Sequence, residues 1–277
     1  MTAPILGAVI GSPVSHSLSP AIYAAAFDDR GISGEYGAVE TSAAECCATV
    51  RRLVDAGARA VSVTMPLKET VIGCLDRIDD DARILRAVNC VSVVDGRLVG
   101  HNTDGDGCCD ALEQQGGAAL LGATAVVLGA GATARSVALA LVRRGAHVVV
   151  VNRTAERATE LVAMVGDTGP GTVRTGAASD ISSASVLVNT TSVGMNSTDL
   201  PVDPVHLHRG LVVLDAVYQP METALLAACR ELGATVVDGL WMLIQQARRQ
   251  CVHQFGWTPD ASPMRAAAEK VLAGRAK

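Results

Sequence analysis

The feature that most constrains the fold is an alternation of short β-branched runs with longer helical patterns along nearly the whole chain. In the first part, strands are expected at 5–10, 36–40, 59–63 and 91–94, and helices at 19–30, 43–56, 66–73 and 79–86. Later strands are expected at 124–128, 147–151, 185–189, 211–215 and 235–237, with helices at 132–144, after Thr154, and at 239–255 and 260–274. Such alternation predicts mostly parallel sheets with helices on both faces.

A loop at 101–107 separates two such series. We therefore expect two α/β domains with a cleft between them, which is the usual place for a ligand. Gly145 follows the helix pattern at 132–144 and is expected to end it. Thr154 can cap the next helix.

Composition narrows the possible functions. Hydrophobic residues make up 49% and aromatic residues only 3%, so we expect a core of Ala, Val, Leu and Ile. The net charge of −5 gives no excess of positive charge that would favour binding to nucleic acid or an anionic membrane. Apolar runs stay far below the roughly 20 residues of a membrane span. The N-terminal apolar stretch lacks a basic start and is interpreted as a first strand, not a signal peptide, so a cytoplasmic location is expected.

Cysteine and histidine usage indicates no metal site. The eight cysteines contain no C-x-x-C, and the six histidines show no metal-ligand spacing. A chain of this length without a signal peptide does not need a disulfide framework. We interpret the cysteines as small buried apolar residues in a reducing compartment.

A glycine-rich turn predicts a dinucleotide site. The strand 124–128 runs directly into a G-x-G-x-x-A motif that opens a helix: Gly129, Ala130, Gly131, Ala132, Thr133 and Ala134. Gly129 permits a tight turn, and Gly131 lets the backbone approach a pyrophosphate at the positive helix N-terminus. Glycine-rich turns can also be mere connections, but the strand–turn–helix context favours a dinucleotide.

The end of the next strand indicates which dinucleotide is bound. An NAD site usually carries Asp or Glu here, whereas this chain has Asn152, Arg153 and Thr154, with Arg157 one turn later. Two guanidinium groups would bind a 2′-phosphate, which favours NADP. The alternative is that they only solvate a helix start, although cations there oppose the macrodipole.

Four polar motifs punctuate the first part of the chain. They are Ser17-Leu18-Ser19-Pro20, Ser62-Val63-Thr64-Met65-Pro66-Leu67-Lys68, Ala87-Val88-Asn89 and Asn102-Thr103-Asp104-Gly105. Each has a plain structural interpretation: Ser19 can cap a helix with Pro20 at its first position, and Lys68 can be a solvated surface group. Two serines two residues apart can also present hydroxyls to a carboxylate.

In this order, together with the later motifs, these segments resemble the shikimate dehydrogenase family, which also holds quinate and aminoshikimate dehydrogenases. The resemblance runs through HSLSP (16–20), VTMPLK (63–68), AVN (87–89), NTDG (102–105), GAGATAR (129–135), NRT..RA (152–158), NTTSVGM (189–195), DAVYQP..T.LL (215–226) and DGLWMLIQQ (238–246). It implies a substrate-binding and catalytic domain at 1–104, a Rossmann-type NADP domain at 105–238, and C-terminal helices at 239–277 that pack back on the substrate domain.

The resemblance also implies a reaction and a set of site residues. The reaction would be the reversible NADP-dependent reduction of 3-dehydroshikimate to shikimate, in a monomer or homodimer. Ser17 and Ser19 would hold the substrate carboxylate. The ring and its hydroxyls would be lined by Thr64, Lys68, Asn89, Asp104, Tyr218 and Gln246. NADP would be bound by Gly129 to Thr133 and Asn152 to Arg157, with Ala216 and Gly239 near the nicotinamide and Asp80 contributing from the other domain.

The chemistry of these residues agrees with alcohol oxidation. A group must take the hydroxyl proton as hydride leaves, and Lys68 can do so, while its cationic form can polarise the ketone in reverse. Asp104 is a hydrogen-bond partner for the same hydroxyl, and either residue can be the formal proton carrier.

The chain departs from the family's pattern at several positions. Tyr23 stands where His is common, Ser62 where Asn is usual, and Arg86 where Gly is usual, and Ala132-Thr133 loosens the phosphate loop. Ser62 would contact the substrate less directly than Asn, which leaves quinate and aminoshikimate as alternative substrates. A non-catalytic NADP sensor is a further alternative, disfavoured by Lys68, Asp104 and Gln246.

Overall fold

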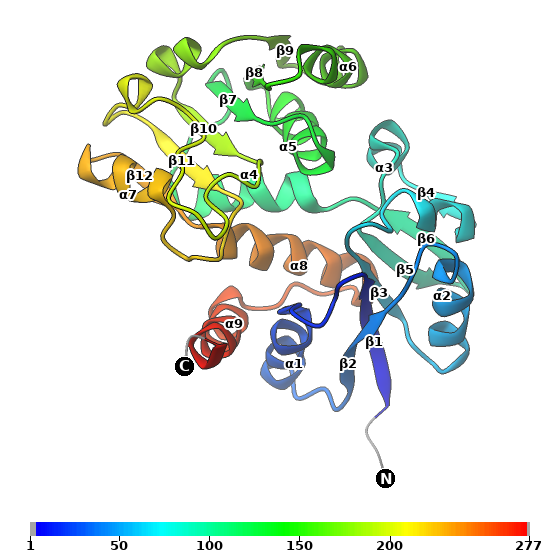
Figure 1. Ribbon diagram of the computed structural model, residues 1–277. Coiled ribbons are helices and arrows are strands. Elements are labelled where there is room, and N and C mark those ends of the chain that lie inside the picture. Colours follow the sequence, from blue (N-terminus) through cyan, green and yellow to red (C-terminus); the bar gives the residue numbers. More distant parts are fainter. Residues whose placement is uncertain (1–3, 276–277) are drawn as a thin grey trace. The chain divides into compact units, whose positions relative to one another are not determined.

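The computed structural model describes residues 4–275, which divide into two compact units. The first unit joins the residues up to Thr103 with those from Ala247 onward, and the second runs from Asp104 to Gln246 (Figure 1). The division falls inside α8 (Gly239–Phe255), a helix that the sequence places at the same residues.

The first unit contains a six-stranded sheet of mixed direction. Its strands are β1 (Ile5–Gly11), β2 (Glu35–Glu40), β3 (Ala60–Val63), β4 (Arg77–Ile78), β5 (Cys90–Val94) and β6 (Arg97–His101). Their order is β2-β1-β3-β5-β6-β4, and β5 runs antiparallel to both of its neighbours while the other pairs are parallel. The mostly parallel sheet is therefore confirmed, with the short β4 and the hairpin partner β6 as additions.

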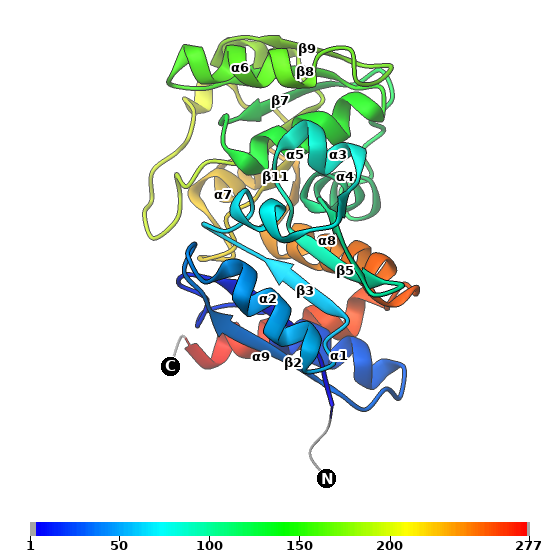
Figure 2. The same cartoon turned by 90° about the vertical axis from the view of Figure 1, so that its right-hand side faces the viewer.

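Helices cover both faces of this sheet. They are α1 (Ser19–Asp29), α2 (Cys46–Asp55), the 3-10 helix η1 (Thr70–Cys74), α3 (Asp80–Leu85), the end of α8, and α9 (Ala261–Arg275). Figures 1 and 2 show α1 and α9 side by side, with α2 across the sheet from them. The predicted helix at 66–73 is instead this short 3-10 helix.

Side-chain alternation along β3 divides the core of the first unit into two parts. Val61 and Val63 join the aliphatic cluster beneath α2. Ser62 points to the opposite face, because successive side chains of a strand alternate, and meets Tyr23 of α1 and Tyr36 of β2.

The face beneath α1 is aromatic. Five of the seven aromatic side chains of the chain form successive ring contacts there: Tyr23, Phe27, Tyr36, Phe255 and Trp257. A core of Ala, Val, Leu and Ile therefore describes the cluster beneath α2, but it is wrong for this face.

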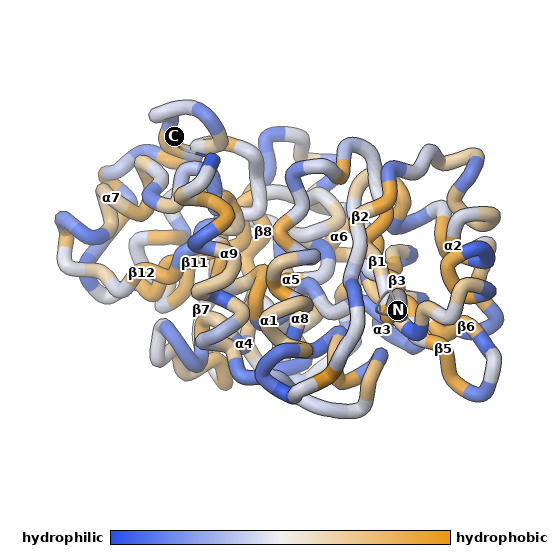
Figure 3. Tube along the Cα trace, turned by 90° about the horizontal axis from the view of Figure 1, so that it is seen from below, coloured by the Kyte–Doolittle hydropathy of each residue, from blue (hydrophilic) through white to orange (hydrophobic). Residues whose placement is uncertain are grey.

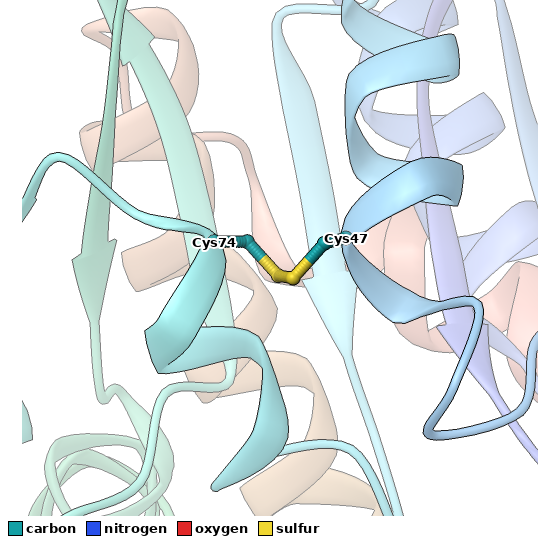
Figure 4. The surroundings of a disulfide bond; sticks show 2 residues. All are labelled: Cys47 and Cys74. Atoms are coloured by element: carbon teal, nitrogen blue, oxygen red, sulfur yellow. A yellow bond between two sulfur atoms is a disulfide. The ribbon is translucent and has the colours of Figure 1, made fainter.

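One disulfide joins two elements of the first unit. Cys47 of α2 is bonded to Cys74 at the end of η1, with their Cα atoms 5.1 Å apart (Figure 4). The expectation that all eight cysteines are free thiols is wrong for this pair, because folding brings together two cysteines separated by 27 positions. The other six are free and buried, as predicted.

The second unit contains a fully parallel six-stranded sheet. Its strands are β7 (Thr124–Leu128), β8 (His147–Val151), β9 (Thr172–Thr175), β10 (Val186–Asn189), β11 (Val212–Asp215) and β12 (Thr235–Val237). Their order, β12-β11-β10-β7-β8-β9, is the doubly wound dinucleotide-binding order, with its switch point between β7 and β10. Hydrophobic and hydrophilic stretches alternate along the chain in Figure 3, and the residues of the central strands β7 and β10 are almost all buried, as expected for strands covered on both faces.

Around this sheet lie α4 (Asp104–Gln114), α5 (Ala132–Arg143), α6 (Ala155–Val165), α7 (Ala224–Glu231), the start of α8, and the 3-10 helices η2 (Ala178–Ser183) and η3 (Pro204–His206). Gly145 has a φ of +81° just after α5, as a helix-ending glycine should. Thr154 occupies the N-cap position of α6, but its side chain makes no capping hydrogen bond, so that part of the prediction is wrong.

The described residues offer neither a membrane-spanning helix nor a metal-binding cluster. Within residues 4–275, no helix combines the length and apolar character needed to cross a membrane. The same residues contain no cluster of three or more His, Cys, Asp or Glu that could hold a metal ion.

Candidate functional site

In the first unit, the loop at 62–68, the motif at 87–89 and the chain just before Asn102 meet at one edge of the sheet. Thr64 N–H donates to the Ile10 carbonyl at 2.9 Å, which places the loop after β3 beside the end of β1. Val63 N–H donates to the Asn89 carbonyl at 2.9 Å, and Asn89 N–H donates to the His101 carbonyl at 3.0 Å. The ends of β1, β3 and β6 and the start of β5 therefore lie together, where α/β sheets usually bind ligands.

The two serines of the first motif lie at the start of α1. Ser19 is the first residue of the helix, and its N–H donates to Ser17 Oγ at 3.2 Å. Leu18, not Ser19, occupies the N-cap position, so the plain capping interpretation of Ser19 is wrong. Both serines are half-buried.

The loop that carries Thr64 and Lys68 is fixed through its backbone. The Lys68 carbonyl accepts a hydrogen bond from Val88 N–H at 2.8 Å, which joins this loop to the Ala87–Asn89 motif. A Cβ on Gly11 would lie 2.9 Å from the Met65 carbonyl oxygen, so a glycine is needed where the loop passes β1. Thr64 and Lys68 are both half-buried.

Asn89 and Ser62 make interior hydrogen bonds. Asn89 is 2% exposed, and its Oδ1 accepts from Thr103 N–H at 2.8 Å. Ser62 is 5% exposed, and its Oγ lies 2.5 Å from the Tyr36 hydroxyl and also bonds to Gln250 Oε1. Its hydroxyl is therefore engaged inside the first unit.

Asp80 lies away from these loops, in the first turn of α3. Its side chain is 80% exposed and paired with Arg83. The preceding Asp79 caps α3 through Ala82 N–H at 2.7 Å and contacts His101 Nδ1 at 2.9 Å. Burial alone would raise the pKa of Asp79, but the bonds from His101 and Ala82 outweigh it and hold that pKa below its usual value.

In the second unit, the glycine motif lies at the switch point of the sheet. Gly129 has a φ of +109°, and a Cβ there would lie 2.7 Å from Thr190 Oγ1 at the end of β10. Gly131 is the N-cap residue of α5, and a Cβ there would meet nothing within 4 Å. The backbone at the positive end of α5 is therefore open to a ligand.

A pocket of about 370 Å³ opens beside this helix start. It is lined by Ala130, Gly131, Arg135, Arg157, Glu160, Leu161 and Met164. Two guanidinium groups and the start of α5 thus surround one cavity, which fits the phosphates of a dinucleotide. Sequence reasoning missed Arg135, although its place one helical turn after Gly131 was a usable signal.

Asn152, Arg153 and Thr154 follow β8, as predicted. Asn152 Nδ2 donates to the Thr154 carbonyl at 2.8 Å and shapes the turn into α6. The Arg153 side chain is exposed. Arg157 is the arginine of this motif that lines the pocket.

A buried carboxylate, Asp215, directly precedes the loop that carries Ala216 and Tyr218. Asp215 accepts from Asn189 Nδ2 at 2.9 Å, Thr223 Oγ1 at 2.7 Å and Val217 N–H at 3.1 Å. Burial raises the pKa of Asp215, against these three bonds, which lower it. Sequence reasoning quoted Asn189, Asp215 and Thr223 within motifs but gave them no role.

The chain passes close to itself at two glycines of this unit. A Cβ on Gly239 would lie 2.6 Å from the Ala216 carbonyl oxygen, so the structure brings these two predicted residues together. A Cβ on Gly107 would lie 2.5 Å from Gln246 N, so α4, which begins at Asp104, approaches α8 at Gln246. Asp104 is buried and Gln246 half-buried.

Comparisons with known proteins agree with both units. A family model described as "Shikimate dehydrogenase substrate binding domain" matches residues 9–91, and one described as "Shikimate / quinate 5-dehydrogenase" matches residues 111–194. The shikimate dehydrogenase (NADP(+)) of Thermococcus kodakarensis is 41% identical over 260 residues, which cover 94% of each chain.

Solved structures show the same architecture. Shikimate 5-dehydrogenase of Thermus thermophilus, solved with NADP(H) and shikimate, is 37% identical with a TM-score of 0.88, covering 96% of this chain and 99% of that one. A ligand-free 5-ketofructose reductase of Gluconobacter is 29% identical with a TM-score of 0.90, covering 96% and 98%. The profile matches and the identity over almost the full length establish that this chain belongs to the shikimate dehydrogenase family.

Proposed function

We propose that this protein catalyses the reversible NADP-dependent reduction of 3-dehydroshikimate to shikimate, an oxidoreductase reaction of aromatic amino-acid biosynthesis. The observation that carries the proposal is the 41% identity, over 94% of both chains, to an NADP-dependent shikimate dehydrogenase. The strand-edge loops of the first unit and the doubly wound sheet of the second support the proposal, since they suit the two kinds of site that this reaction needs.

On the cofactor side, the phosphates would be held by Gly129, Ala130, Gly131, Ala132 and Thr133 at the start of α5. Asn152, Arg153, Thr154 and Arg157 would surround the adenosine 2′-phosphate. Arg157 carries most weight here, because it lines the pocket beside Gly131. Ala216 and Gly239 would lie near the nicotinamide, and Asp80 would make a peripheral contact.

On the substrate side, Ser17 and Ser19 would bind the carboxylate. Thr64, Lys68, Asn89, Asp104, Tyr218 and Gln246 would line the ring and its hydroxyls. Ser62 stands where Asn is usual and would contact the substrate less directly, and its interior hydrogen bonds favour a different role.

The chemistry assigned to these residues is proton exchange and orientation. NADP, when bound, exchanges a hydride with the carbinol carbon of the substrate. Lys68 would exchange the hydroxyl proton, or donate it to the carbonyl oxygen in the reducing direction. Asp104 would hydrogen-bond the same hydroxyl and orient it toward Lys68.

A substrate panel tests the proposal. Turnover of shikimate, quinate and aminoshikimate would be measured with NADP and with NAD, through the absorbance of the reduced nicotinamide. We expect the highest kcat/KM for shikimate with NADP. A higher kcat/KM for quinate or aminoshikimate would move the protein to a sibling activity, and no turnover with any of them would favour the non-catalytic sensor.

Two finer points are part of the same proposal. A cytoplasmic location suits a biosynthetic enzyme, and fractionation of the source cells would test it. The oligomeric state is proposed to be monomer or homodimer, which light scattering coupled to gel filtration distinguishes.

A further inference from the structure

A buried hydrogen-bonded cluster lies beneath α1 in the first unit. Its members are Tyr23, Tyr36, Ser62, Gln250 and Gln254. The rings of Tyr23 and Tyr36 stack with centroids 3.8 Å apart. The two glutamines are one turn apart on α8, so both side chains lie on the same helix face.

Each hydroxyl in the cluster has an acceptor. The Tyr36 hydroxyl accepts from Ser62 N–H at 3.2 Å and lies 2.5 Å from Ser62 Oγ. Ser62 Oγ donates to Gln250 Oε1. The Tyr23 hydroxyl has Gln250 Oε1 at 2.9 Å and Gln254 Oε1 at 3.0 Å.

These donors fix the orientation of both amides. Because the hydroxyls donate to the two Oε1 atoms, the Nε2 groups turn the other way, toward β5. Gln250 Nε2 donates to the Asn89 carbonyl at 3.3 Å, and Gln254 Nε2 donates to the Val91 carbonyl at 3.3 Å. The Asn89 carbonyl also accepts from Val63 N–H at 2.9 Å, directly before Thr64.

Two departures from the family pattern therefore meet in one place. Tyr23 and Ser62, which replace the usual His and Asn, have their oxygens 3.5 Å apart and share Gln250 as a partner. Through Gln250, both act on the backbone of Asn89, where the substrate-side loops join.

We propose that this cluster is a positioning network, in which Gln250 holds the Asn89 carbonyl and thereby sets the placement of Asn89 and Thr64 toward the substrate. The inference rests on the proposed function for the identity of the substrate. It makes Ser62 and Tyr23 positioning residues rather than direct contacts.

The network is neutral over the working range of pH. The titratable groups that face it are Tyr23 of α1, Tyr36 of β2, Cys90 of β5 and Cys251 of α8. Burial raises the pKa of each of the four above its ordinary value. A carboxyl group introduced here would therefore be a new charge among neutral neighbours.

The decisive variant is Gln250→Glu. Its protonated carboxyl keeps one acceptor oxygen and can still donate to the Asn89 carbonyl, whereas its ionised form repels that carbonyl. Burial raises the pKa of a carboxyl group, so the ionisation falls within an assay range of about pH 6 to 9. We expect the KM for shikimate, divided by that of the unmutated protein, to rise about tenfold across this range. The KM for NADP should change less than about twofold.

Gln254→Glu is the matched control. Gln250 and Gln254 are 2% and 3% exposed, and both accept a hydrogen bond from Tyr23. They differ in the carbonyl to which they donate, because Gln254 donates to that of Val91, two residues after Asn89. A merely structural cluster would give both variants the same loss of thermal stability and the same KM profile. An equal rise for Gln254→Glu, or a flat profile for a folded Gln250→Glu, would overturn the proposal.

Tyr36→Phe covers the case in which Gln250→Glu does not fold. It removes only one hydroxyl, and we expect a rise of about twofold to fivefold in the KM for shikimate. No change in this variant overturns the network.

Shikimate affinity, measured by titration calorimetry, separates this inference from the proposed function. Absence of turnover in the unmutated protein, with shikimate bound normally, would reject the function alone. Unchanged affinity in the folded variants would reject the network alone.

Discussion

The Lys68 backbone is held independently of its side chain, because its carbonyl accepts from Val88 N–H at 2.8 Å. A substitution at Lys68 therefore removes the amine without removing the bond that joins the two loops. The backbone of Asn89 is anchored as well, because its carbonyl accepts from Val63 and Gln250.

Lys68→Ala is expected to lower kcat far more than it weakens binding. Loss of a positioned acid–base group costs about 10²–10⁴-fold in rate, and the loop anchor stays in place. Steady-state kinetics in the direction of shikimate oxidation measure the effect. Lys270→Ala, an exposed position on α9, is the control. Near-normal turnover of a folded Lys68→Ala would remove this residue from the mechanism.

Arg153→Ala is expected to reduce the preference for NADP over NAD. A charge-assisted bond to a phosphate contributes roughly 1.5–3 kcal/mol, so the ratio of kcat/KM values should fall about tenfold to a hundredfold. Arg143→Ala, at the far end of α5, should leave the ratio unchanged. Equal use of both cofactors by the unmutated protein would contradict the interpretation of the residues after β8.

The helices and strands that could be predicted from the sequence are those in which apolar residues recur without a break. The five predicted strands of the second unit follow from runs such as 124–128 and 147–151, and their burial agrees with that pattern. α4 was missed because Gly105 and Gly107 are poor helix formers. The same glycines are what close packing requires, since a Cβ on either would overlap backbone atoms of α5 or α8.

Gly105→Ala tests this balance at the scale of the element. Alanine would favour the helix by about 1 kcal/mol, but its Cβ would collide with the Ser136 carbonyl and lie 2.9 Å from Ala140 Cβ. Overpacking costs about 1–3 kcal/mol, so we expect a lower Tm. Gly274→Ala in α9, where a Cβ meets nothing within 4 Å, should not lower it. A Tm for Gly105→Ala at or above that of the unmutated protein would show that α4 and α5 can move apart at little cost in free energy.

At the scale of the whole molecule, contacts between residues far apart in the sequence could not be predicted. Tyr23 and Gln250 are 227 positions apart, and no local sequence pattern predicts that they are in contact. The pairing of Cys47 with Cys74 was equally hidden, because eight cysteines offer many pairs. The loops at 62–68, 87–89 and 102–105, which we propose to form the substrate site, could be predicted as loops because each borders a strand.

Reduction of the Cys47–Cys74 disulfide is expected to lower the free energy of unfolding. Constraint of a loop of 27 residues in the unfolded chain contributes about 3 to 4 kcal/mol at most. Thermal unfolding with and without a reductant measures it. Cys47→Ser should unfold at the same temperature in both conditions, and an unmutated protein indifferent to the reductant would contradict the expectation.

We expect the buried tyrosine hydroxyls and cysteine thiols to make the stability of the whole molecule sensitive to high pH. Burial raises the pKa of Tyr23 and Tyr36 above the ordinary 10.0, and it also raises the pKa of all six free thiols above the ordinary 9.0. The folded protein keeps these protons where the unfolded chain releases them. Their contribution to stability is therefore complete below the unfolded pKa values and is lost as pH rises from there through the raised folded pKa values.

Each such group costs about 1.4 kcal/mol per pH unit once the unfolded form ionises and the folded form does not. We expect a Tm that is steady from about pH 7 to 8 and falls steeply above about pH 9. Tyr36→Phe removes one titrating group, so its Tm should fall less steeply above pH 10, whatever its Tm at neutral pH. If Tm falls with the same slope above pH 10 in both proteins, the Tyr36 hydroxyl ionises as readily in the folded state as in the unfolded chain.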